Sequence, residues 1–336
     1  MSPLLEVRDL QVRFALARES WTPWAPRRFV HAVSDLGFHL DAGETLAIVG
    51  ESGCGKSSLA RALVGLNPIH SGSIRFHGRE LAGADRATWH AVRGAIQMVF
   101  QDPLSSLDPR MSIGQAIAEP LQAQRPGLAA TELRERVRHM AQRVGVPAAL
   151  LNRYPHEFSG GQCQRVGIAR ALIVEPALLI CDEPVSALDV SIQAQILNLL
   201  RELQREEQLA MLFIAHDLAV VRHLADRVLV MYLGRGMEQA SGETLFRQPA
   251  HPYTQALLRA APVPDPQRAR KRGGQTLAGE LPSPVSPPSG CVFRTRCPLA
   301  EAACAAAIPA ARGDEKAWAA CIKAGQIQRV AEPSAP

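Results

Sequence analysis

The stretch from Gly50 to Ser57 combines the residue types and the spacing of a phosphate-binding loop. It fits the pattern G-x-x-x-x-G-K-S/T and reads Gly50-Glu51-Ser52-Gly53-Cys54-Gly55-Lys56-Ser57. Glycines allow successive backbone N–H groups to converge on phosphate oxygens, a lysine reaches the β- and γ-phosphates, and a serine hydroxyl binds Mg²⁺. We therefore predict that this loop, with Ser58 directly after it, binds ATP, and that Ser57 is a ligand of Mg²⁺.

Two adjacent carboxylates, Asp182 and Glu183, follow the apolar run Leu178-Leu179-Ile180-Cys181. At the end of a buried strand, one carboxylate can hold Mg²⁺ while its neighbour acts on a water molecule. We expect Asp182 to bind Mg²⁺ and Glu183 to polarise the attacking water, a role worth about 10²–10⁴ in rate. Either acid alone would be an ordinary surface residue, so the assignment depends on the motifs around them.

Further polar motifs stand in one order around these carboxylates. They are Phe100-Gln101-Asp102-Pro103, Ser159-Gly160-Gly161-Gln162, Ser186-Ala187-Leu188-Asp189 and Ala215-His216-Asp217. A bare S-G-G-Q segment is as easily a turn, and a lone histidine before a helix is as easily a surface residue. Their occurrence together, in this order and with the phosphate-binding loop, indicates a common site.

The segments that carry the motifs alternate between strand-like and helix-like patterns from Leu4 to about Tyr232. Apolar runs suited to buried strands are Thr45 to Val49, Ala177 to Cys181, Met211 to Ala215 and Val228 to Tyr232. A helical pattern, Leu59 to Val64, follows the phosphate-binding loop. This alternation predicts an α/β core.

Strand signals vanish between Asp102 and about Phe158. The clearest helix of this region is expected from Thr131 to Val144, with Thr131 as its N-cap and apolar residues at helical spacing after it. We predict a helical subdomain at about residues 102–172, inserted in a nucleotide-binding domain of residues 1–250.

The chain changes character from His251 onward. A short helical stretch to Ala260 is followed by a proline-rich segment, which we expect to be an extended connector because proline interrupts regular helix. Its prolines are Pro262, Pro264, Pro266, Pro282, Pro284, Pro287 and Pro288. Residues 251–336 are therefore predicted to form a C-terminal extension.

Four of the seven cysteines fall in this extension, at Cys291, Cys297, Cys304 and Cys321. Disulfides are disfavoured in a reducing cytosol, and the spacing lacks the C-x₂-C pairs of ordinary zinc ribbons, although it leaves a Cys₄ zinc site open. Four thiolates can also hold a [4Fe-4S] cluster. The remaining cysteines lie within the nucleotide motifs, where we interpret them as small residues that fit a core: Cys54, Cys163 and Cys181.

Composition excludes several classes of protein. With 336 residues and 47% hydrophobic content the chain can bury a sizeable core, so it is not a disordered protein. No apolar run approaches the roughly 18 residues of a transmembrane helix, and the start from Met1 to Glu6 lacks the basic segment of a signal peptide, so we expect a cytoplasmic location. The 37 basic residues nearly balance 32 acidic ones, which argues little for nucleic acid. The basic run Arg268 to Arg272 is interpreted as a solvated linker, with contact to lipid headgroups left open.

Taken together, the motifs resemble those of the nucleotide-binding subunits of ABC transporters, along nearly the whole chain. The resemblance implies a P-loop NTPase fold, with a RecA-like core, an antiparallel β portion and an inserted helical subdomain. It implies that Gln101 contacts Mg²⁺ and the attacking water and that His216 contacts the γ-phosphate. Ser159-Gly160-Gly161-Gln162 resembles the signature sequence that binds the γ-phosphate held by a partner cassette. Phe14 is the candidate for stacking on adenine, although a core phenylalanine fits equally well.

Partners follow from the same resemblance, because two cassettes of this family face each other head to tail. It implies a second ABC ATPase, usually a different chain, two membrane permease subunits and a substrate-binding protein outside the membrane, with no direct contact to nucleic acid. The chain would then lie at the cytoplasmic face of the inner membrane as a peripheral subunit. The alternative is a soluble ABC ATPase that acts on ribosomes or nucleic acid, but such chains typically join two cassettes or carry long insertions.

Several stretches resemble the ATPases of dipeptide and oligopeptide importers, a branch that also includes nickel importers. They are Gln101 to Arg110, His251-Pro252-Tyr253-Thr254 and Gly279 to Pro284. The long span from Phe14 to Val30, with Trp21 and Trp24, is similar to the dipeptide-type F subunit. This resemblance implies ATP-driven uptake of di- or oligopeptides, and it favours a [4Fe-4S] cluster over zinc at the tail cysteines.

Two positions depart from the family pattern. Ser58 stands where threonine is usual, and Cys163 stands after the signature where arginine is usual. The serine is a chemically conservative change. We expect the loss of positive charge at Cys163 to weaken contact with a partner cassette without abolishing activity.

Overall fold

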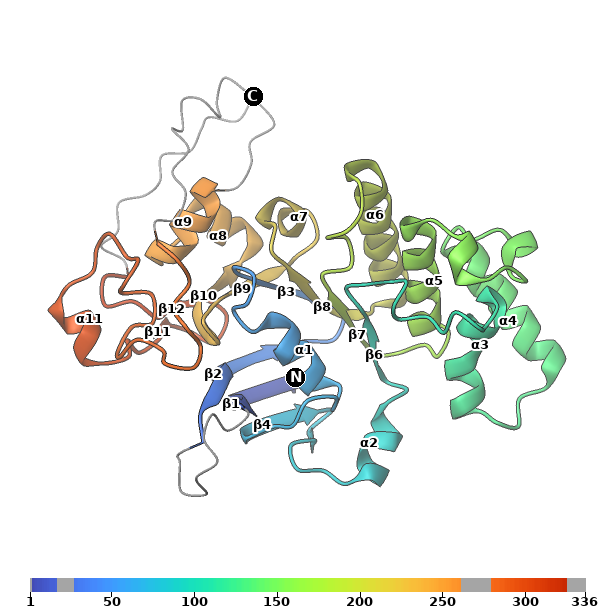
Figure 1. Ribbon diagram of the computed structural model, residues 1–336, viewed down its shortest axis with the longest axis horizontal. Helices are drawn as coiled ribbons and strands as arrows, with labels where there is room; N and C mark the ends of the chain where they lie inside the picture. Colours follow the sequence, from blue (N-terminus) through green and yellow to red (C-terminus); the bar gives the residue numbers. More distant parts are fainter. Residues whose placement is uncertain (1, 17–26, 261–278, 325–336) are drawn as a thin grey trace. The chain divides into compact units, whose positions relative to one another are not determined.

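The computed structural model describes residues 2–16, 27–260 and 279–324 (Figure 1). Two compact units make up the chain. The helical unit comprises Leu40–Thr45 and Ala84–Ile214 with the first residues of the chain, and the P-loop unit comprises Leu5–His39, Leu46–Gly83 and the described residues from Ala215 onward. Some expectations fall outside the described residues, namely those for Trp21, Trp24, the basic run at 268–272 and the prolines at 262, 264 and 266.

The helical unit contains parallel strands that are built from apolar runs. These strands are β6 (Ile96–Val99), β7 (Leu178–Asp182) and β8 (Ala210–Ala215), and β7 lies between the other two. The register pairs Val99 with Cys181 and Asp182 with Ile214. Every residue of β7 and β8 is buried, as a run without polar alternation requires when both faces of a sheet are covered.

Only helical elements lie between β6 and β7. They are α3 (Ile113–Gln124), α4 (Ala130–Arg143), η1 (Ala148–Leu150), η2 (Pro155–Glu157) and α5 (Gly160–Leu172). Before β6 stands α2 (Arg86–Val92), and after β7 comes α6 (Val190–Glu207). The boundary predicted for residues 102–172 as a subdomain stays a prediction, although this range holds no strand.

The start expected for α4 is wrong. This helix begins at Ala130, its N-cap position is Ala129, and no side chain caps it by a hydrogen bond. Thr131 therefore lies inside the first turn, where its backbone is already helical. By contrast, α3 begins after Ser112, which forms a capping box with Gln115.

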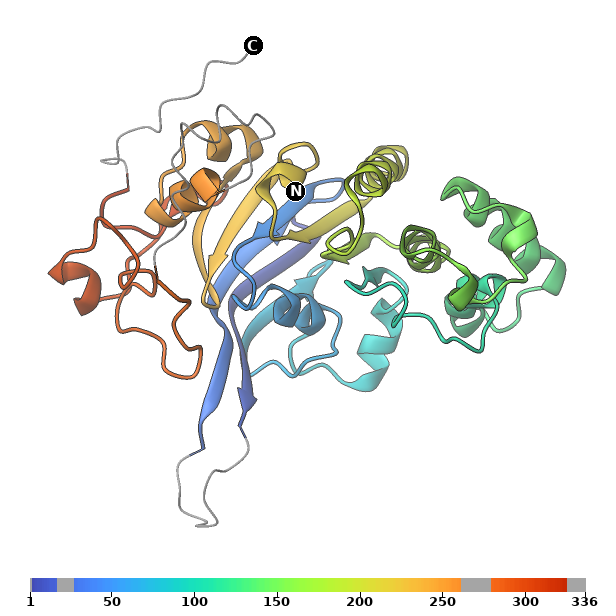
Figure 2. The same ribbon diagram turned by 45° about the horizontal axis from the view of Figure 1, so that its top comes forward.

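The P-loop unit contains an antiparallel sheet in the order β2-β1-β4-β5. Its strands are β1 (Leu5–Ala15), β2 (Phe29–Leu40), β4 (Ser71–Phe76) and β5 (Arg79–Glu80). Figure 2 shows β1 and β2 as long neighbouring strands. Their alternating buried and exposed residues are typical of a sheet that has one face on the core.

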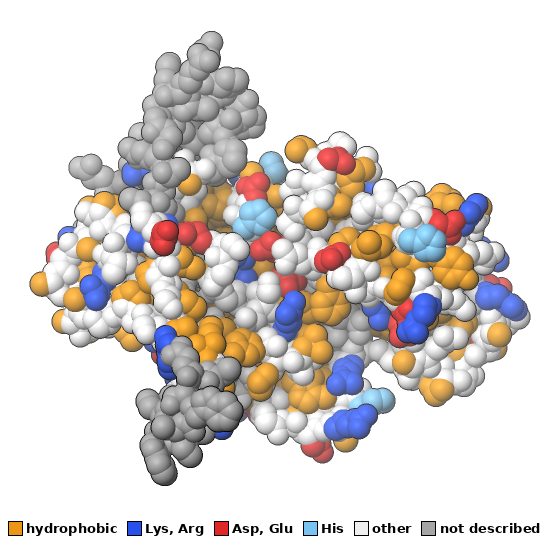
Figure 3. All heavy atoms as spheres, viewed as in Figure 1, with side chains coloured by type: hydrophobic (Ala, Val, Ile, Leu, Met, Phe, Trp, Pro, Cys, Tyr) orange, Lys and Arg blue, Asp and Glu red, His pale blue; other side chains and the backbone are white. Residues whose placement is uncertain are grey.

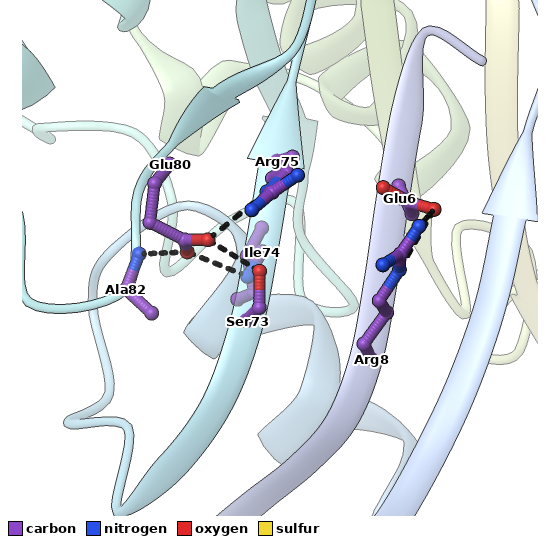
Figure 4. A network of polar contacts seen from close by, with 7 residues as sticks. All are labelled: Glu6, Arg8, Ser73, Ile74, Arg75, Glu80 and Ala82. Atoms are coloured by element: carbon purple, nitrogen blue, oxygen red, sulfur yellow. Dashed lines mark hydrogen bonds and ion pairs between the residues drawn. The ribbon is translucent and has the colours of Figure 1, made fainter. Parts of the chain in front are cut away.

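Glu80 ties the turn between β4 and β5 to the sheet (Figure 4). Its Oε1 atom accepts hydrogen bonds of 2.9 Å from the backbone N–H groups of Ile74 and Ala82. Its Oε2 atom accepts from the Ser73 hydroxyl and, at 3.5 Å, from Arg75 Nε. Burial alone would raise the pKa of Glu80, but the hydrogen bonds hold it below the usual value.

A second sheet in the P-loop unit has the order β3-β9-β10-β12-β11. It consists of β3 (Thr45–Val49), β9 (Arg227–Tyr232), β10 (Arg235–Ser241), β12 (Trp318–Ala319) and β11 (Arg312–Gly313). The pair β3 and β9 is parallel, and the other pairs are antiparallel. Through the pairing of Glu238 with Ala319 and of Gln239 with Trp318, the C-terminal extension continues the sheet.

The helices of the P-loop unit are short. They are α1 (Lys56–Leu63), α7 (Leu218–Arg222), α8 (Gly242–Arg247), α9 (Pro252–Ala260) and α11 (Ala302–Ala306). Together the two units form the α/β P-loop fold that the motifs predict. Among the described residues, no helix has both the length and the apolar character needed to cross a membrane. On the face drawn in Figure 3, basic and acidic side chains are interspersed.

Gly161 offers a test of the packing inside the helical unit. A Cβ atom at this position would lie 2.5 Å from Cγ2 of Ile192 in α6, whereas a Cβ atom at Gly167, in the same helix, would meet open space. We expect Gly167→Ala to raise the free energy of unfolding by about 1 kcal/mol, the helix-propensity gain. Gly161→Ala should instead lose about 1–3 kcal/mol to overpacking. Thermal unfolding followed by circular dichroism measures both, and equal midpoints would contradict the packing argument.

Candidate nucleotide-binding and hydrolysis site

The phosphate-binding loop follows β3 directly and runs close to neighbouring backbone. A Cβ atom at Gly50 would lie 2.2 Å from the Met231 carbonyl oxygen, and one at Gly55 would lie 2.0 Å from the Ala32 carbonyl oxygen. Gly55 also has a φ of 106°, in the left-handed region. Neither position has room for a Cβ atom, and the φ of Gly55 also favours glycine. The loop ends at α1, whose N-terminal N–H groups favour an anion.

Lys56, the first residue of α1, is hydrogen-bonded to the backbone of the loop. Its side chain is buried, and its Nζ atom donates to the carbonyl oxygens of Gly50 at 2.8 Å and Glu51 at 3.0 Å. The ammonium group is thus held at the loop by carbonyl dipoles. An incoming phosphate, with its full negative charge, is the stronger partner for this cation.

The other residues of the loop differ in their exposure. Ser52 and Gly53 are exposed, and Ser57 and Ser58 are half-buried in the first turn of α1. Cys54 is buried, with its Sγ atom 3.9 Å from Lys56 Nζ, and burial raises the pKa of its thiol. A neutral thiol in such a place acts as a small core side chain, as predicted from the sequence.

The two carboxylates stand at the end of β7 in the helical unit. Asp182 is buried, and the next residue, Glu183, has a φ of 44°, which is strained for a residue with a side chain. Such a conformation costs on the order of 1–3 kcal/mol and is typical of functional sites. It is held by a hydrogen bond from Glu183 N–H to the Ile214 carbonyl oxygen at 3.1 Å.

Gln101 and Glu183 meet in the structure, although they are far apart in the sequence. Gln101 Nε2 donates to Glu183 Oε2 at 3.2 Å. An amide donor at this distance orients the carboxylate without neutralising it. Glu183 can therefore accept a proton or a hydrogen bond from a water molecule, as a general base must.

The Ser159-Gly160-Gly161-Gln162 motif forms the N-terminus of α5. Ser159 is the N-cap, its Oγ atom accepts from Gln162 N–H at 3.4 Å, and Gln162 Oε1 accepts from Ser159 N–H at 2.9 Å. Ser159, Gly160 and Gln162 are exposed, whereas Gly161 packs inward. The motif is thus a capped helix start with an accessible serine, an arrangement suited to an anion.

Cys163 directly follows this motif in α5. It is buried, and its Sγ atom lies 3.6 Å from the Pro155 carbonyl oxygen, to which it donates. Its thiol therefore belongs to the core of the helical unit. The third cysteine of the motifs, Cys181, is also buried and free in β7.

His216 and Phe14 both lie in the P-loop unit. His216 follows β8 and is exposed, and Asp217 caps the helix after it by accepting from Ala219 N–H at 2.8 Å. Phe14 is half-buried near the end of β1. The proposed contacts of His216 with the γ-phosphate and of Phe14 with adenine stay predictions, as does the Mg²⁺ ligand set of Ser57, Gln101 and Asp182.

Contacts between the C-terminal extension and the phosphate-binding loop were missed by the sequence analysis. The backbone N–H of Glu51 donates to Tyr253 Oη at 3.0 Å, and Arg296 forms an ion pair with the Glu51 carboxylate. Tyr253 lies in the H-P-Y-T motif, which could have signalled a role. For Arg296 the only signal was its place beside Cys297.

The four cysteines of the extension line one small cavity. They are Cys291, Cys297, Cys304 and Cys321. Burial raises the pKa of three of these thiols, that of Cys297 to about 11, and neighbouring thiols add to the effect. Within the part of the chain that the structure describes, no group of three or more His, Cys, Asp or Glu side chains has the arrangement needed to hold a metal ion.

A phosphate-binding loop after a buried strand, a glutamate of positive φ directly after a buried aspartate, and a capped S-G-G-Q helix are together typical of an ABC-type nucleotide-binding cassette. Residues 33–186 match the ABC transporter family, and residues 237–304 match the C-terminal region of oligopeptide/dipeptide transporters. The oligopeptide transport ATP-binding protein OppF of Escherichia coli is 55% identical over 95% of this chain and 96% of its own. The di/tripeptide transport ATP-binding protein DppF of Pseudomonas aeruginosa is 47% identical over 97% of this chain and 99% of its own. The chain therefore belongs to the family of ATP-binding subunits of oligopeptide and dipeptide ABC transporters.

Solved structures agree on the fold. CbiO1 of Clostridium perfringens, part of an ABC transporter complex, has a TM-score of 0.61 and 31% identity, and covers 73% of this chain and 91% of its own. A dimeric bacterial ABC transporter cassette has a TM-score of 0.63 and 24% identity, and covers 70% of this chain and 98% of its own. As a member of this family the chain is an ATPase subunit, which confirms the prediction made from the loop and the carboxylates.

Glu183 can be tested as the base of ATP hydrolysis. We expect Glu183→Gln to keep ATP binding and to lower the turnover of the assembled complex by about 10²-fold or more, because an amide cannot accept the proton of water. A coupled phosphate-release assay and equilibrium ATP binding measure the two effects.

Glu175→Gln is the matched control, since Glu175 is an exposed glutamate of the same unit that also has a positive φ, of 57°. It should leave turnover within about twofold. Turnover retained in Glu183→Gln would remove Glu183 from the catalytic role.

Proposed function

We propose that this chain is the ATP-hydrolysing subunit of a binding-protein-dependent ABC importer, which couples ATP binding and hydrolysis to the uptake of di- and oligopeptides across the inner membrane. The observation that carries the proposal is the similarity to peptide-transport ATPases over both the nucleotide motifs and the C-terminal extension. The ordered loop and the Gln101–Glu183 pair support an active ATPase. A soluble ABC ATPase acting on ribosomes or nucleic acid is not favoured, because it does not account for the extension.

Oligopeptides are the first cargo to test. Relatives with this name are 54–55% identical to the chain, in Escherichia coli and Haemophilus influenzae, against 47% for the di/tripeptide relative. Cargo selection in such a system is the task of the binding protein and the permeases. The identity of the cargo is therefore a property of the whole importer.

The partners proposed are a second ABC ATPase, two membrane permease subunits and an external substrate-binding protein. The exposed Ser159 and Gly160 at the N-terminus of α5 suit an ATP molecule carried by the second ATPase. ATP that binds the closed pair more tightly than the open pair shifts the population toward the closed state, and hydrolysis reverses the shift. The chain would act at the cytoplasmic face of the inner membrane.

Mg²⁺ accompanies ATP in the proposed site and neutralises the charge that develops on the phosphates. Ser57 and Asp182 offer a hydroxyl and a carboxylate, which are oxygen ligands of the kind that Mg²⁺ prefers. Gln101 adds an amide oxygen to this set. These residues are proposed as the Mg²⁺ ligands of the chain.

We propose a [4Fe-4S] cluster as the cofactor of the four tail cysteines. All four line one cavity, which Lys323 and Arg294 also line, and these cations would offset the charge of four thiolates. The spacing of these cysteines lacks the C-x₂-C pairs of ordinary zinc ribbons, and the resemblance to peptide-importer ATPases favours the cluster over zinc. Burial raises the pKa values of Cys291, Cys297 and Cys321, so cluster binding to their thiolates would release protons.

Peptide uptake tests the proposed transport. In cells whose only copy of this protein is Glu183→Gln, we expect uptake of a labelled tripeptide and a labelled pentapeptide to fall at least tenfold, because the driving hydrolysis step is lost. Cells carrying Glu175→Gln should take up both peptides at the wild-type rate. Unchanged uptake of both peptides at normal expression would contradict peptide import.

Iron analysis tests the proposed cofactor. Anaerobically purified protein should contain about four iron and four sulfide per chain. Cys304→Ser should lose most of this iron, whereas Cys163→Ser, at a buried cysteine outside the extension, should keep it. One zinc per chain would select the alternative metal site, and protein with neither metal would contradict both.

A further inference from the structure

The second residue of the phosphate-binding loop, Glu51, carries a negative charge where the loop must receive a polyanion. Its carboxylate is held by Arg296 of the C-terminal extension, whose Nη1 atom donates to Oε1 at 3.0 Å and to Oε2 at 2.9 Å. The Arg296 side chain is 5% exposed and that of Glu51 is 26% exposed. Because Arg296 is buried and Glu51 is half-buried, this ion pair is screened less than a fully exposed one, so its charge balance bears on any anion nearby.

The remaining polar groups of Glu51 are also engaged. Its N–H donates to Tyr253 Oη at 3.0 Å, and its carbonyl oxygen accepts from Lys56 Nζ at 3.0 Å. Tyr253 is fully buried. Tyr253 and Arg296 thus fix this part of the loop. Lys56, by contrast, is expected to exchange its bond with the Glu51 carbonyl for a bond with the phosphates when the nucleotide binds.

Arg296 is preorganised by aromatic packing. Phe293, three residues before it, is fully buried and lies edge-to-face with Tyr232 at 5.3 Å between ring centroids, and 5.1 Å from Tyr253. The Arg296 guanidinium carbon lies 5.8 Å from the centroid of Tyr232, and Nη1 also donates to Tyr232 Oη at 3.4 Å. The arginine is therefore held for its partner before ATP arrives.

A second contact brings the extension to the same loop. Leu281 lies beside Gly53, where a built Cβ atom would be 3.7 Å from its Cδ2 atom, and the Pro284 carbonyl oxygen accepts from His31 N–H at 3.0 Å. The extension therefore contacts the loop at Glu51 and at Gly53, and it contacts strand β2 at His31. The ion pair is part of a wider contact and not a single chance approach of two surface chains.

We propose that Arg296 is a positioning residue of the nucleotide site: it neutralises and orients Glu51, so that the loop built by the core depends on the C-terminal extension for its affinity for ATP. Without the arginine, a partly buried carboxylate would face the triphosphate unpaired, and repulsion would weaken ATP binding. The chemical step involves neither residue directly. Arg296 therefore acts on binding and leaves the rate of the bound complex nearly unchanged.

The test uses ATP itself, with equilibrium binding to the full chain and steady-state kinetics of the assembled ATPase. Arg296→Gln should raise the Kd and KM for ATP about tenfold while kcat stays within about twofold. Arg296→Lys should recover part of the affinity, because it restores the charge without the bidentate geometry. The matched control is Arg247→Gln, which removes an arginine from an exposed ion pair with Glu243 and should change neither constant.

The double variant Glu51→Gln/Arg296→Gln separates charge from structure. Its ATP affinity should return to within about threefold of wild type, because the offending charge is gone. An unchanged Kd in Arg296→Gln, or a double variant as weak as Arg296→Gln, would overturn the proposal. If Arg296→Gln shows no cooperative thermal transition, the single variant Glu51→Gln provides the test. An ATP affinity equal to or higher than that of the wild type supports the proposal, and a lower ATP affinity refutes it. None of these readouts depends on the cargo of the importer.

Discussion

The nucleotide site depends on one packing constraint, the contact of the phosphate-binding loop with the backbone of neighbouring strands. Gly50 lies against the Met231 carbonyl in β9, and Gly55 lies against the Ala32 carbonyl in β2. No side chain fits at either point, so the two strands set the path of the loop. That path in turn brings the carbonyl oxygens that hold Lys56. A loop without these supports would carry the same residues without their alignment.

The helical unit places the two adjacent carboxylates by a related packing constraint. The fully buried strand β7 ends at Asp182, and Glu183 follows it directly. The left-handed backbone of Glu183 is held by the Ile214 carbonyl oxygen on the next strand, and its carboxylate accepts from the Gln101 side chain. This strained conformation persists because the surrounding sheet fixes the backbone at Glu183. Glu183 therefore has a backbone conformation different from that of Asp182, although the two acids are adjacent in the sequence.

The C-terminal extension belongs physically to the nucleotide-binding core. It continues a sheet through β10 and β12, and it buries Phe293 between Tyr232 and Tyr253. The same packing presents Arg296 to the loop and gathers the four cysteines around one cavity. Cys297, which lines that cavity, directly follows Arg296, which forms the ion pair with Glu51.

Local sequence determined the strands and the motifs of this protein. The apolar run Thr45 to Val49 predicts β3 residue for residue, and the other runs predict their strands to within one residue, because a buried strand must be apolar on both faces. The start of α4 was missed, since its cap, Ala129, offers no side-chain signal. Only the tertiary structure decided which residues meet. Gln101 and Glu183 are 82 residues apart, and Glu51 and Arg296 are 245 apart. Such contacts arise from the packing of strands and aromatic rings, and no local pattern encodes a partner at that distance.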